Sequence, residues 1–208
     1  MSDIPNRYLL PAGTVLWRIH SQKTDAAGFT AFDKGPRVFR ARFECEPHPG
    51  YSAGLDAQTL IADLLLRGIR MSERRFRTVR RVRILGMRAS AVPTAAELSL
   101  VSLVSTPDLV AANLANDVLF AEEIPGVIRE WADRIRERAP WAHGLIWPTE
   151  HDRTRRLVVL FGDRCGSAAL DSPPVFTVDL DDEYGAVWLN GMLAPYYARV
   201  MPPRNGHQ

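Results

Sequence analysis

Residues 143–162 read HGLIWPTEHDRTRRLVVLFG, in which two short apolar runs, 144–147 and 157–161, flank a polar stretch. Short apolar runs rich in β-branched and aromatic residues are typical of buried strands. The segment therefore predicts two buried strands. The polar side chains that follow Pro148 mark either a strand end in water or the rim of a site; they are Thr149, Glu150 and His151.

The rest of the chain predicts a mixture of strands and helices. Further strands are expected at 14–21, 37–45 and 77–87, and near 175–180. Helices are expected at 56–69, in three pieces over 94–138, and near 184–200. In the first helix Asp56 can cap the N-terminus and Gly68 lies near the end. Because strands and helices do not alternate regularly, we expect an α+β domain rather than a doubly wound sheet.

Length and composition predict one ordinary globular domain. The chain has 208 residues, 46% hydrophobic and 24% charged, and no apolar run approaches the roughly 20 residues that span a bilayer. The first residues do not have the pattern of a signal peptide, so we expect a cytoplasmic protein without membrane partners. The five histidines and two cysteines show no metal-ligand spacing, so no metal is expected. We place an extension at 1–13, the domain at 14–200 and a frayed tail at 201–208.

Four polar side chains occupy positions where a ligand would explain them. Arg18 lies within an apolar strand, where a charge needs a partner or a cleft unless it faces an edge. Arg40 and Arg42 share one strand face and would suit a pyrophosphate, or lie in solvent. Tyr51 follows a Pro-Gly break and either stacks on a ligand or packs in the core.

Two further features of the sequence can be explained either by structure alone or by function. Asp63 interrupts an apolar helix stripe, and taken alone an ion pair with Arg67 at i,i+4 explains it. Residues 67–88 contain nine arginines, which could indicate a nucleic-acid surface. Aromatic residues are few there, so a solvated face or a surface for an acidic protein is at least as well supported, and we expect no direct nucleic-acid binding.

The order of several motifs resembles the RES domain family, named for Arg, Glu and Ser. The motifs are LWRIH (16–20), RARFE (40–44), YSAG (51–54), TLIADLLLR (59–67), HGLIWPTEHD (143–152) and LVVLF (157–161). They cover about residues 14–162. Asp63 stands where the family has glutamate, and Thr149 where it has serine.

The resemblance implies a fold, a substrate and roles for residues. Family members resemble ADP-ribosyltransferases, with small central sheets and surrounding helices, and act as toxins that cleave the nicotinamide–ribose bond of NAD. Asp63, Arg18 and Thr149 would then be catalytic. Arg42, Tyr51 and Arg40 would bind the substrate.

The resemblance also implies partners and leaves alternatives open. The implied acceptor of ADP-ribose is phosphate, water or a protein, and the implied partner is a cognate antitoxin of helix-turn-helix type. Self-association stays open. The alternatives are a catalytically weak homologue that binds NAD or a partner without turnover, and a nucleic-acid binder that uses segment 67–88.

Overall fold

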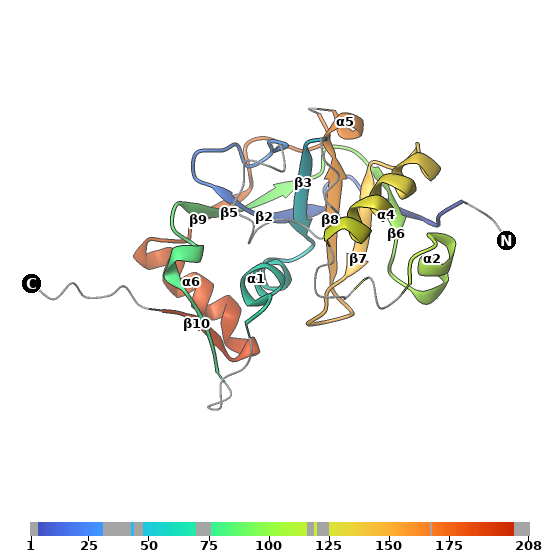
Figure 1. Ribbon diagram of the computed structural model, residues 1–208. Helices are drawn as coiled ribbons and strands as arrows, with labels where there is room; N and C mark the ends of the chain where they lie inside the picture. The colour runs from blue at the N-terminus through green and yellow to red at the C-terminus, as the bar shows by residue number, and fades with distance from the viewer. Residues whose placement is uncertain are drawn as a thin grey trace, which may run out of the picture.

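The fold is built on an eight-stranded sheet with the order β1-β6-β7-β8-β3-β2-β5-β9 (Figure 1). The computed structural model describes residues 4–30, 43, 48–69, 76–115, 119, 125–166 and 168–201, apart from the side chains of 125–129. Neighbouring strands are antiparallel except for the parallel pair β6 and β7. Strand β10 pairs in parallel with β4 in a second, two-stranded sheet.

The strands of the large sheet are short to medium in length. They are β1 (Arg7–Leu10), β2 (Val15–Ser21), β3 (Gly50–Gly54), β5 (Met87–Pro93), β6 (Leu98–Ser102), β7 (Gly144–Pro148), β8 (Arg156–Phe161) and β9 (Phe176–Asp179). The small sheet holds β4 (Arg77–Val79) and β10 (Ala198–Val200). A single residue pair, Trp17 with Gly54, joins β2 to β3.

The described helices range from four to 14 residues in length. They are α1 (Ala57–Leu66), α2 (Thr106–Ala111), α4 (Pro125–Arg138), α5 (Gly162–Cys165) and α6 (Glu183–Leu193), with 3₁₀ turns η2 (Arg81–Arg83) and η3 (Ala194–Tyr196). The carboxylate of Asp56 accepts a hydrogen bond from the Thr59 amide, and Ser105 and Asp108 form a capping box at α2. Such caps stabilise a helix by about 1 kcal/mol.

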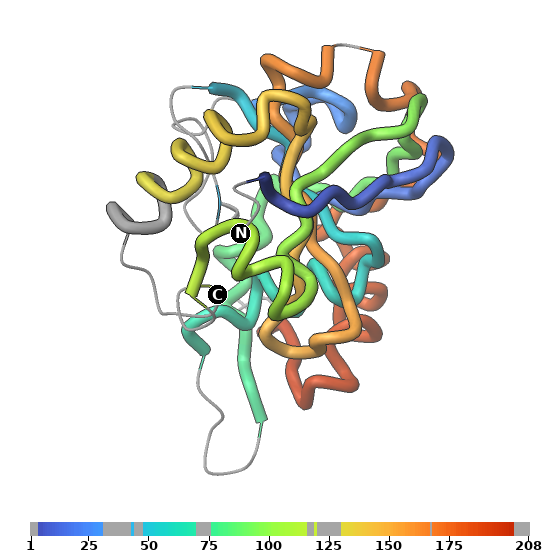
Figure 2. The backbone as a smooth tube through the Cα atoms, turned by 90° about the vertical axis from the view of Figure 1, so that its right-hand side faces the viewer, coloured from blue at the N-terminus to red at the C-terminus, as the bar shows by residue number. Residues whose placement is uncertain are grey.

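The two faces of the large sheet are covered differently. Helices α1, α4 and α6 bury apolar side chains against one face, in a cluster that includes Leu65, Ile135 and Leu189. Residues from strands and loops fill the other cluster, among them Tyr51, Leu160 and Leu170. Figure 2 views the molecule from the β1 side, with β1 in dark blue toward the viewer and α6 in red farther away. We call the face covered by α1, α4 and α6 the helix face and the opposite face the loop face.

Several predictions of elements are confirmed. Strands appear at β2, β7, β8 and β9, and helix α1 begins after Asp56 as expected. Gly68 follows α1 with a φ of +70°, a conformation that favours glycine. The α+β class is also confirmed, with one large sheet in place of the small sheets expected.

Three predictions of elements are wrong. The strand expected at 77–87 is interrupted by η2, because Arg81 and Arg83 turn back to bind backbone carbonyls of Asp181 and Leu65. The first helical piece expected after residue 94 is strand β6, whose pairing with β1 and β7 overrides local preference. The helix expected near 184–200 ends at Leu193 and is followed by η3 and β10. The strand expected at 37–45 lies outside the described residues, apart from Phe43.

The ends of the expected domain have specific contacts. Residues 7–10, assigned from the sequence to an N-terminal extension, pair with β6 as the edge strand β1. The amide of Met201 donates a hydrogen bond to the carbonyl of Val79, and the residues after it lie outside the description. In the described part of the chain, no helix is both long and apolar enough to cross a bilayer.

Candidate functional site

Arg18 and Tyr51 meet on the loop face of the sheet. Arg18 on β2 is 4% exposed, Tyr51 on β3 is fully buried, and the guanidinium carbon lies 4.4 Å from the centroid of the tyrosine ring. Within the described residues no salt bridge reaches Arg18, and both Arg18 Nε and Tyr51 Oη are buried without a hydrogen-bond partner. A cation and a hydroxyl held this way can bind a polar or anionic group.

Burial shifts the pKa values of both side chains. It lowers the pKa of Arg18, against the opposing effects of Tyr51 and Asp25. It raises the pKa of Tyr51 to about 12, partly offset by the positive charge of Arg18. The pair is therefore a guanidinium beside a protonated phenol at neutral pH, and both are hydrogen-bond donors.

A strap of residues 24–30 covers this pair. Nη1 of Arg18 donates to the carbonyl oxygens of Gly28, at 2.5 Å, and Ala26, at 3.3 Å. The ring of Phe29 lies 5.7 Å from that of Tyr51, and Thr30 forms a bridge with Gly50. The strap therefore supplies neutral oxygens to Arg18, which a more strongly bound anion could replace.

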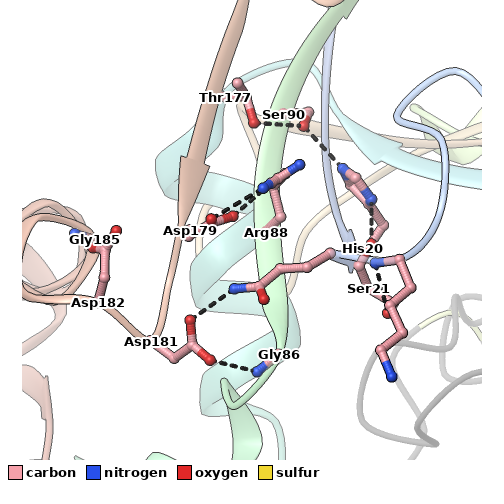
Figure 3. A network of polar contacts seen from close by, with 12 residues as sticks. His20, Ser21, Gly86, Arg88, Ser90, Thr177, Asp179, Asp181, Asp182 and Gly185 are labelled. Carbon is pink, nitrogen blue, oxygen red and sulfur yellow. Dashed lines mark hydrogen bonds and ion pairs between the residues drawn. The ribbon is translucent and has the colours of Figure 1, made fainter.

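A separate polar network lies on the same face around His20 (Figure 3). His20 lies two residues beyond Arg18 on β2, and its Nε2 is 2.9 Å from the hydroxyl of Ser90 on β5. Its Nδ1 is 2.9 Å from the carbonyl oxygen of Ser21, which fits a proton on Nδ1. Burial, with the charge of Arg18 next, lowers the pKa of His20 to about 4. The imidazole is neutral and adds no second buried charge.

The sequence analysis missed this network. The hydroxyl of Ser90 lies 3.5 Å from that of Thr177 on β9, and beside this network Arg88 binds Asp179 through Nε at 2.5 Å and Nη2 at 3.0 Å. The spacing of two between Arg18 and His20 is the pattern that could have revealed it, since such residues share a strand face.

Asp63 lies on the opposite, helix face. Helix α1 packs its apolar stripe into the helix-face cluster, and the carboxylate of Asp63 binds Nη2 of Arg67 at 2.6 Å. The ordinary explanation of Asp63, an i,i+4 ion pair, is thus present in the structure. Asp63 is not brought beside Arg18.

Thr149 begins the turn between β7 and β8. Its Oγ1 accepts a hydrogen bond from the amide of Asp152 at 3.0 Å and donates to the carbonyl of the same residue at 3.3 Å. The turn places the ring of His151 5.9 Å from that of Tyr196. Burial lowers the pKa of His151, and the nearby charge of Asp63 opposes this. Thr149 and His151 therefore belong to the α1 end of the molecule.

The register separates the two groups of residues. Tyr51 pairs with Leu160, and Pro148 pairs with Arg156, so their partners are four residues apart along β8. At about 3.4 Å per residue this is roughly 14 Å along the strand. The structure brings Arg18 and Tyr51 together and places Thr149 and Asp63 elsewhere. Arg40 and Arg42 lie outside the described residues.

The arginines of segment 67–88 make more contacts with the rest of the fold than expected of a solvated face. Of its described arginines, only Arg80 is exposed; Arg67, Arg77, Arg81, Arg83 and Arg88 are half-buried. Arg67 and Arg88 are in ion pairs, while Arg81 and Arg83 bind backbone carbonyls. These contacts leave few of the described guanidinium groups for phosphates.

No group of three or more His, Cys, Asp or Glu side chains in the described part of the chain is placed to hold a metal ion.

Among curated proteins, no sequence matches the chain. Among solved structures, the fold is similar to a chain in the crystal structure of the M. tuberculosis MbcT-MbcA toxin-antitoxin complex. The identity is 15%, the TM-score is 0.59, and the match covers 83% of this chain and 86% of that chain. The model of the RES domain matches residues 15–183, so the chain belongs to the RES domain family.

Proposed function

We propose that this protein is a RES-type toxin that consumes NAD. It cleaves the bond between nicotinamide and ribose and transfers ADP-ribose to phosphate, water or a protein. The observation that carries this proposal is the buried pair of Arg18 and Tyr51, which has a full positive charge and two unpartnered polar atoms among the described residues. Keeping such groups buried costs several kcal/mol, and a bound anionic substrate would offset that cost.

Each site residue has a proposed role. The guanidinium of Arg18 binds a phosphate or the nicotinamide end of NAD, and the ring of Tyr51 contacts the leaving nicotinamide. Positive charge develops on the ribose as the bond breaks, and the proposed role of Asp63 is to stabilise it. Because its carboxylate binds Arg67 on the helix face in the described structure, this role requires the carboxylate to leave Arg67 and to approach the Arg18 end of the site. Thr149 acts through the turn that it closes with Asp152. Arg40 and Arg42 bind pyrophosphate.

The proposed partner is a cognate antitoxin of helix-turn-helix type. The similar solved chain comes from a structure whose title names a toxin-antitoxin complex. A toxin that depletes NAD needs an inhibitor in the cell that makes it. Co-expression with the product of a small adjacent gene, followed by co-purification, tests this partner.

One observation favours a second candidate, a RES homologue that binds NAD without turnover. The carboxylate of Asp63 is held by Arg67 at 2.6 Å and lies on the helix face, away from Arg18. A family member whose acidic residue has been reassigned to an ion pair would keep the Arg18 end of the site and lose the chemistry.

Incubation of the purified protein with NAD, with and without phosphate, separates these candidates. We expect release of nicotinamide, with the second product identifying the acceptor: free ADP-ribose for water, a phosphorylated ADP-ribose for phosphate, or a modified protein. Binding of NAD measured by calorimetry without release of nicotinamide would support the second candidate. Absence of both binding and release would exclude both.

A further inference from the structure

The buried pair of Arg18 and Tyr51 is closed to a ligand in this structure. Arg18 is 4% exposed and Tyr51 is fully buried, so a phosphate or a nicotinamide ring reaches neither side chain until a covering segment moves. The two side chains themselves come from strands of the sheet. The strap, residues 24–30, covers them and belongs to none of these strands. Among the described residues, the strap is therefore the segment whose movement would open the site.

Both ends of the strap are fixed by hydrogen bonds. At its start, the amide and the hydroxyl of Thr24 both donate to the carbonyl oxygen of Ser21, at 3.0 and 2.9 Å. At its end, Thr30 and Gly50 exchange two backbone hydrogen bonds, of 3.1 and 3.0 Å. The part that can lift while these ends stay in place is the short stretch 25–29.

The middle of the strap is a compact turn with hydrogen bonds of its own. The amide of Gly28 donates to the carbonyl oxygen of Asp25 at 3.2 Å, and the amide of Ala27 donates to the Asp25 carboxylate at 3.1 Å. An aspartate that binds the backbone two residues ahead is a common way to stabilise a turn. Because these bonds lie within the strap, they need not break when the turn lifts as a unit.

Few contacts hold this turn over the buried pair. Nη1 of Arg18 binds the carbonyl oxygens of Ala26 and Gly28. The ring of Phe29 packs on that of Tyr51. A phosphate offers the guanidinium an opposite charge, which the neutral carbonyl oxygens lack. The strap and an anionic ligand therefore compete for the same guanidinium.

We propose that the strap is a gate over the NAD site: residues 25–29 occupy Arg18 while the site is empty and must lift before NAD can bind. The inference rests on the proposed function, because it takes Arg18 and Tyr51 as the binding site. When only the open form binds, the apparent affinity is reduced by the fraction of molecules that are open. A change that loosens the strap should therefore strengthen binding by the same factor by which it raises the open fraction.

A thiol introduced by Ala26→Cys reports the open fraction. The side chain of Ala26 is 7% exposed, so a thiol there reacts with iodoacetamide only when the strap lifts. The rate of labelling in the ligand-free chain, followed at this position by mass spectrometry of peptides, is proportional to the open fraction. Binding is measured on the same protein by calorimetry with ADP-ribose, which carries both phosphates of NAD and cannot release nicotinamide.

Phe29→Ala in this background loosens the strap, because the ring contact with Tyr51 is lost. Thiol labelling and affinity for ADP-ribose should both rise about fivefold. Phe29→Leu keeps more of the packing and should raise both by a smaller factor, again equal for the two measurements. It serves as the test if the alanine variant does not fold.

Phe176→Ala is the matched control. Phe176 is half-buried like Phe29, but its ring packs on Trp17 and Trp188 in the helix-face cluster. Its removal should change neither the labelling rate nor the affinity for ADP-ribose. Equal changes in this variant and in Phe29→Ala would mean that general loosening of the fold, and not the strap, controls access, which contradicts the gate.

Three other outcomes would overturn the gate. Faster labelling in Phe29→Ala with unchanged affinity would show that binding does not require an open strap. Faster labelling with weaker affinity would make Phe29 part of the binding surface. If ADP-ribose binds none of these proteins, Arg18 does not exchange the strap for this anion. Release of nicotinamide from NAD by the native chain, measured in parallel, then shows whether the proposed function fails as well.

Discussion

Arg18 and Asp63 are charged residues on opposite faces of the same sheet, and their surroundings differ. Arg18 is 4% exposed, bonds only to neutral carbonyl oxygens and has no carboxylate partner among the described residues. Asp63 has its countercharge on the next turn of its own helix. A buried charge without a partner is costly, whereas an ion pair at i,i+4 is worth only a few tenths of a kcal/mol either way. The position of Arg18 therefore needs a ligand to explain it, and that of Asp63 does not.

Arg18→Met should have the largest effect on activity. Methionine keeps much of the side-chain volume and removes the charge, so kcat/KM for NAD should fall about a thousandfold, as expected when a bound anionic substrate loses a buried countercharge. Stability should be unchanged or higher, because a buried cation is removed. Steady-state kinetics and thermal unfolding check both parts. A variant that consumes NAD normally would show that Arg18 is only structural.

Asp63→Ala should lower kcat about a hundredfold if its carboxylate stabilises charge on the ribose. The matched control is Arg67→Gln, which breaks the same ion pair and keeps the carboxylate. Both side chains are mostly buried, with 27% of Arg67 and 15% of Asp63 exposed, so each variant should lose about 1–3 kcal/mol of stability, and Arg67→Gln the more because it leaves a carboxylate without its partner. Equal activity in the two variants would mean that Asp63 serves only the ion pair, and the candidate that binds NAD without turnover would be favoured.

Tyr51→Phe should change binding and stability in opposite directions. The phenolic oxygen is buried without a partner in the described structure, so its removal should stabilise the fold by about 1 kcal/mol. The same change should weaken NAD binding about tenfold, because a donor is lost. Calorimetric titration and thermal unfolding measure the two effects. Weaker binding together with lower stability would indicate that the hydroxyl is bonded in the free protein.

The sequence predicted elements best where local and tertiary preferences agree. The cap at Asp56, the stripe of α1 and the apolar runs of β7 and β8 all appear as expected. Strand β6 was predicted as helix, because its residues become a strand only through pairing with β1 and β7. The break at η2 depends on contacts of Arg81 and Arg83 with segments distant in the sequence.

The candidate site was predictable residue by residue but not in its arrangement. The unusual position of Arg18 within an apolar strand was visible in the sequence. That its guanidinium stacks on Tyr51 was not, because this contact depends on how β2 and β3 are aligned, and the two strands are paired at a single position. Which face of the sheet α1 covers is not encoded in the order of the motifs. The separation of Asp63 from Arg18 therefore could not be seen before the structure.

The pKa values of two histidines respond separately to the charges of Arg18 and Asp63. The charge of Arg18 lowers the pKa of His20, while the charge of Asp63 raises that of His151. Arg18→Met should therefore raise the pKa of His20 and leave His151 unchanged, and Asp63→Ala should do the reverse, lowering only that of His151. NMR titration of the imidazole signals measures both. A shift of both histidines in either variant would show that the two regions are coupled.

His20 should also make stability depend on pH. Its folded pKa of about 4 lies below the unfolded value of 6.5, so its contribution is complete above pH 6.5 and is lost as the pH falls toward 4. The slope should reach about 1.4 kcal/mol per pH unit, with His151 adding in the same direction. In His20→Gln the slope should be smaller between pH 6.5 and 5, above the range where carboxylates titrate. Denaturant unfolding at several pH values checks this, and an unchanged slope would contradict it.

Thr149 should give the smallest effect, and its two variants separate shape from contact. Both hydrogen bonds of its hydroxyl go to Asp152, so Thr149→Ser should keep the turn and change kcat/KM less than about twofold. Thr149→Val keeps the shape and removes the hydroxyl, which leaves the Asp152 amide without its partner and should cost about 1 kcal/mol of stability. If the residue acts only through the turn, the loss of activity in Thr149→Val should be a few-fold, and it should be recovered when a second, stabilising change elsewhere restores the melting temperature. A loss of a hundredfold that survives such stabilisation would place the hydroxyl on the substrate and bring the α1 end of the molecule into the same site as Arg18.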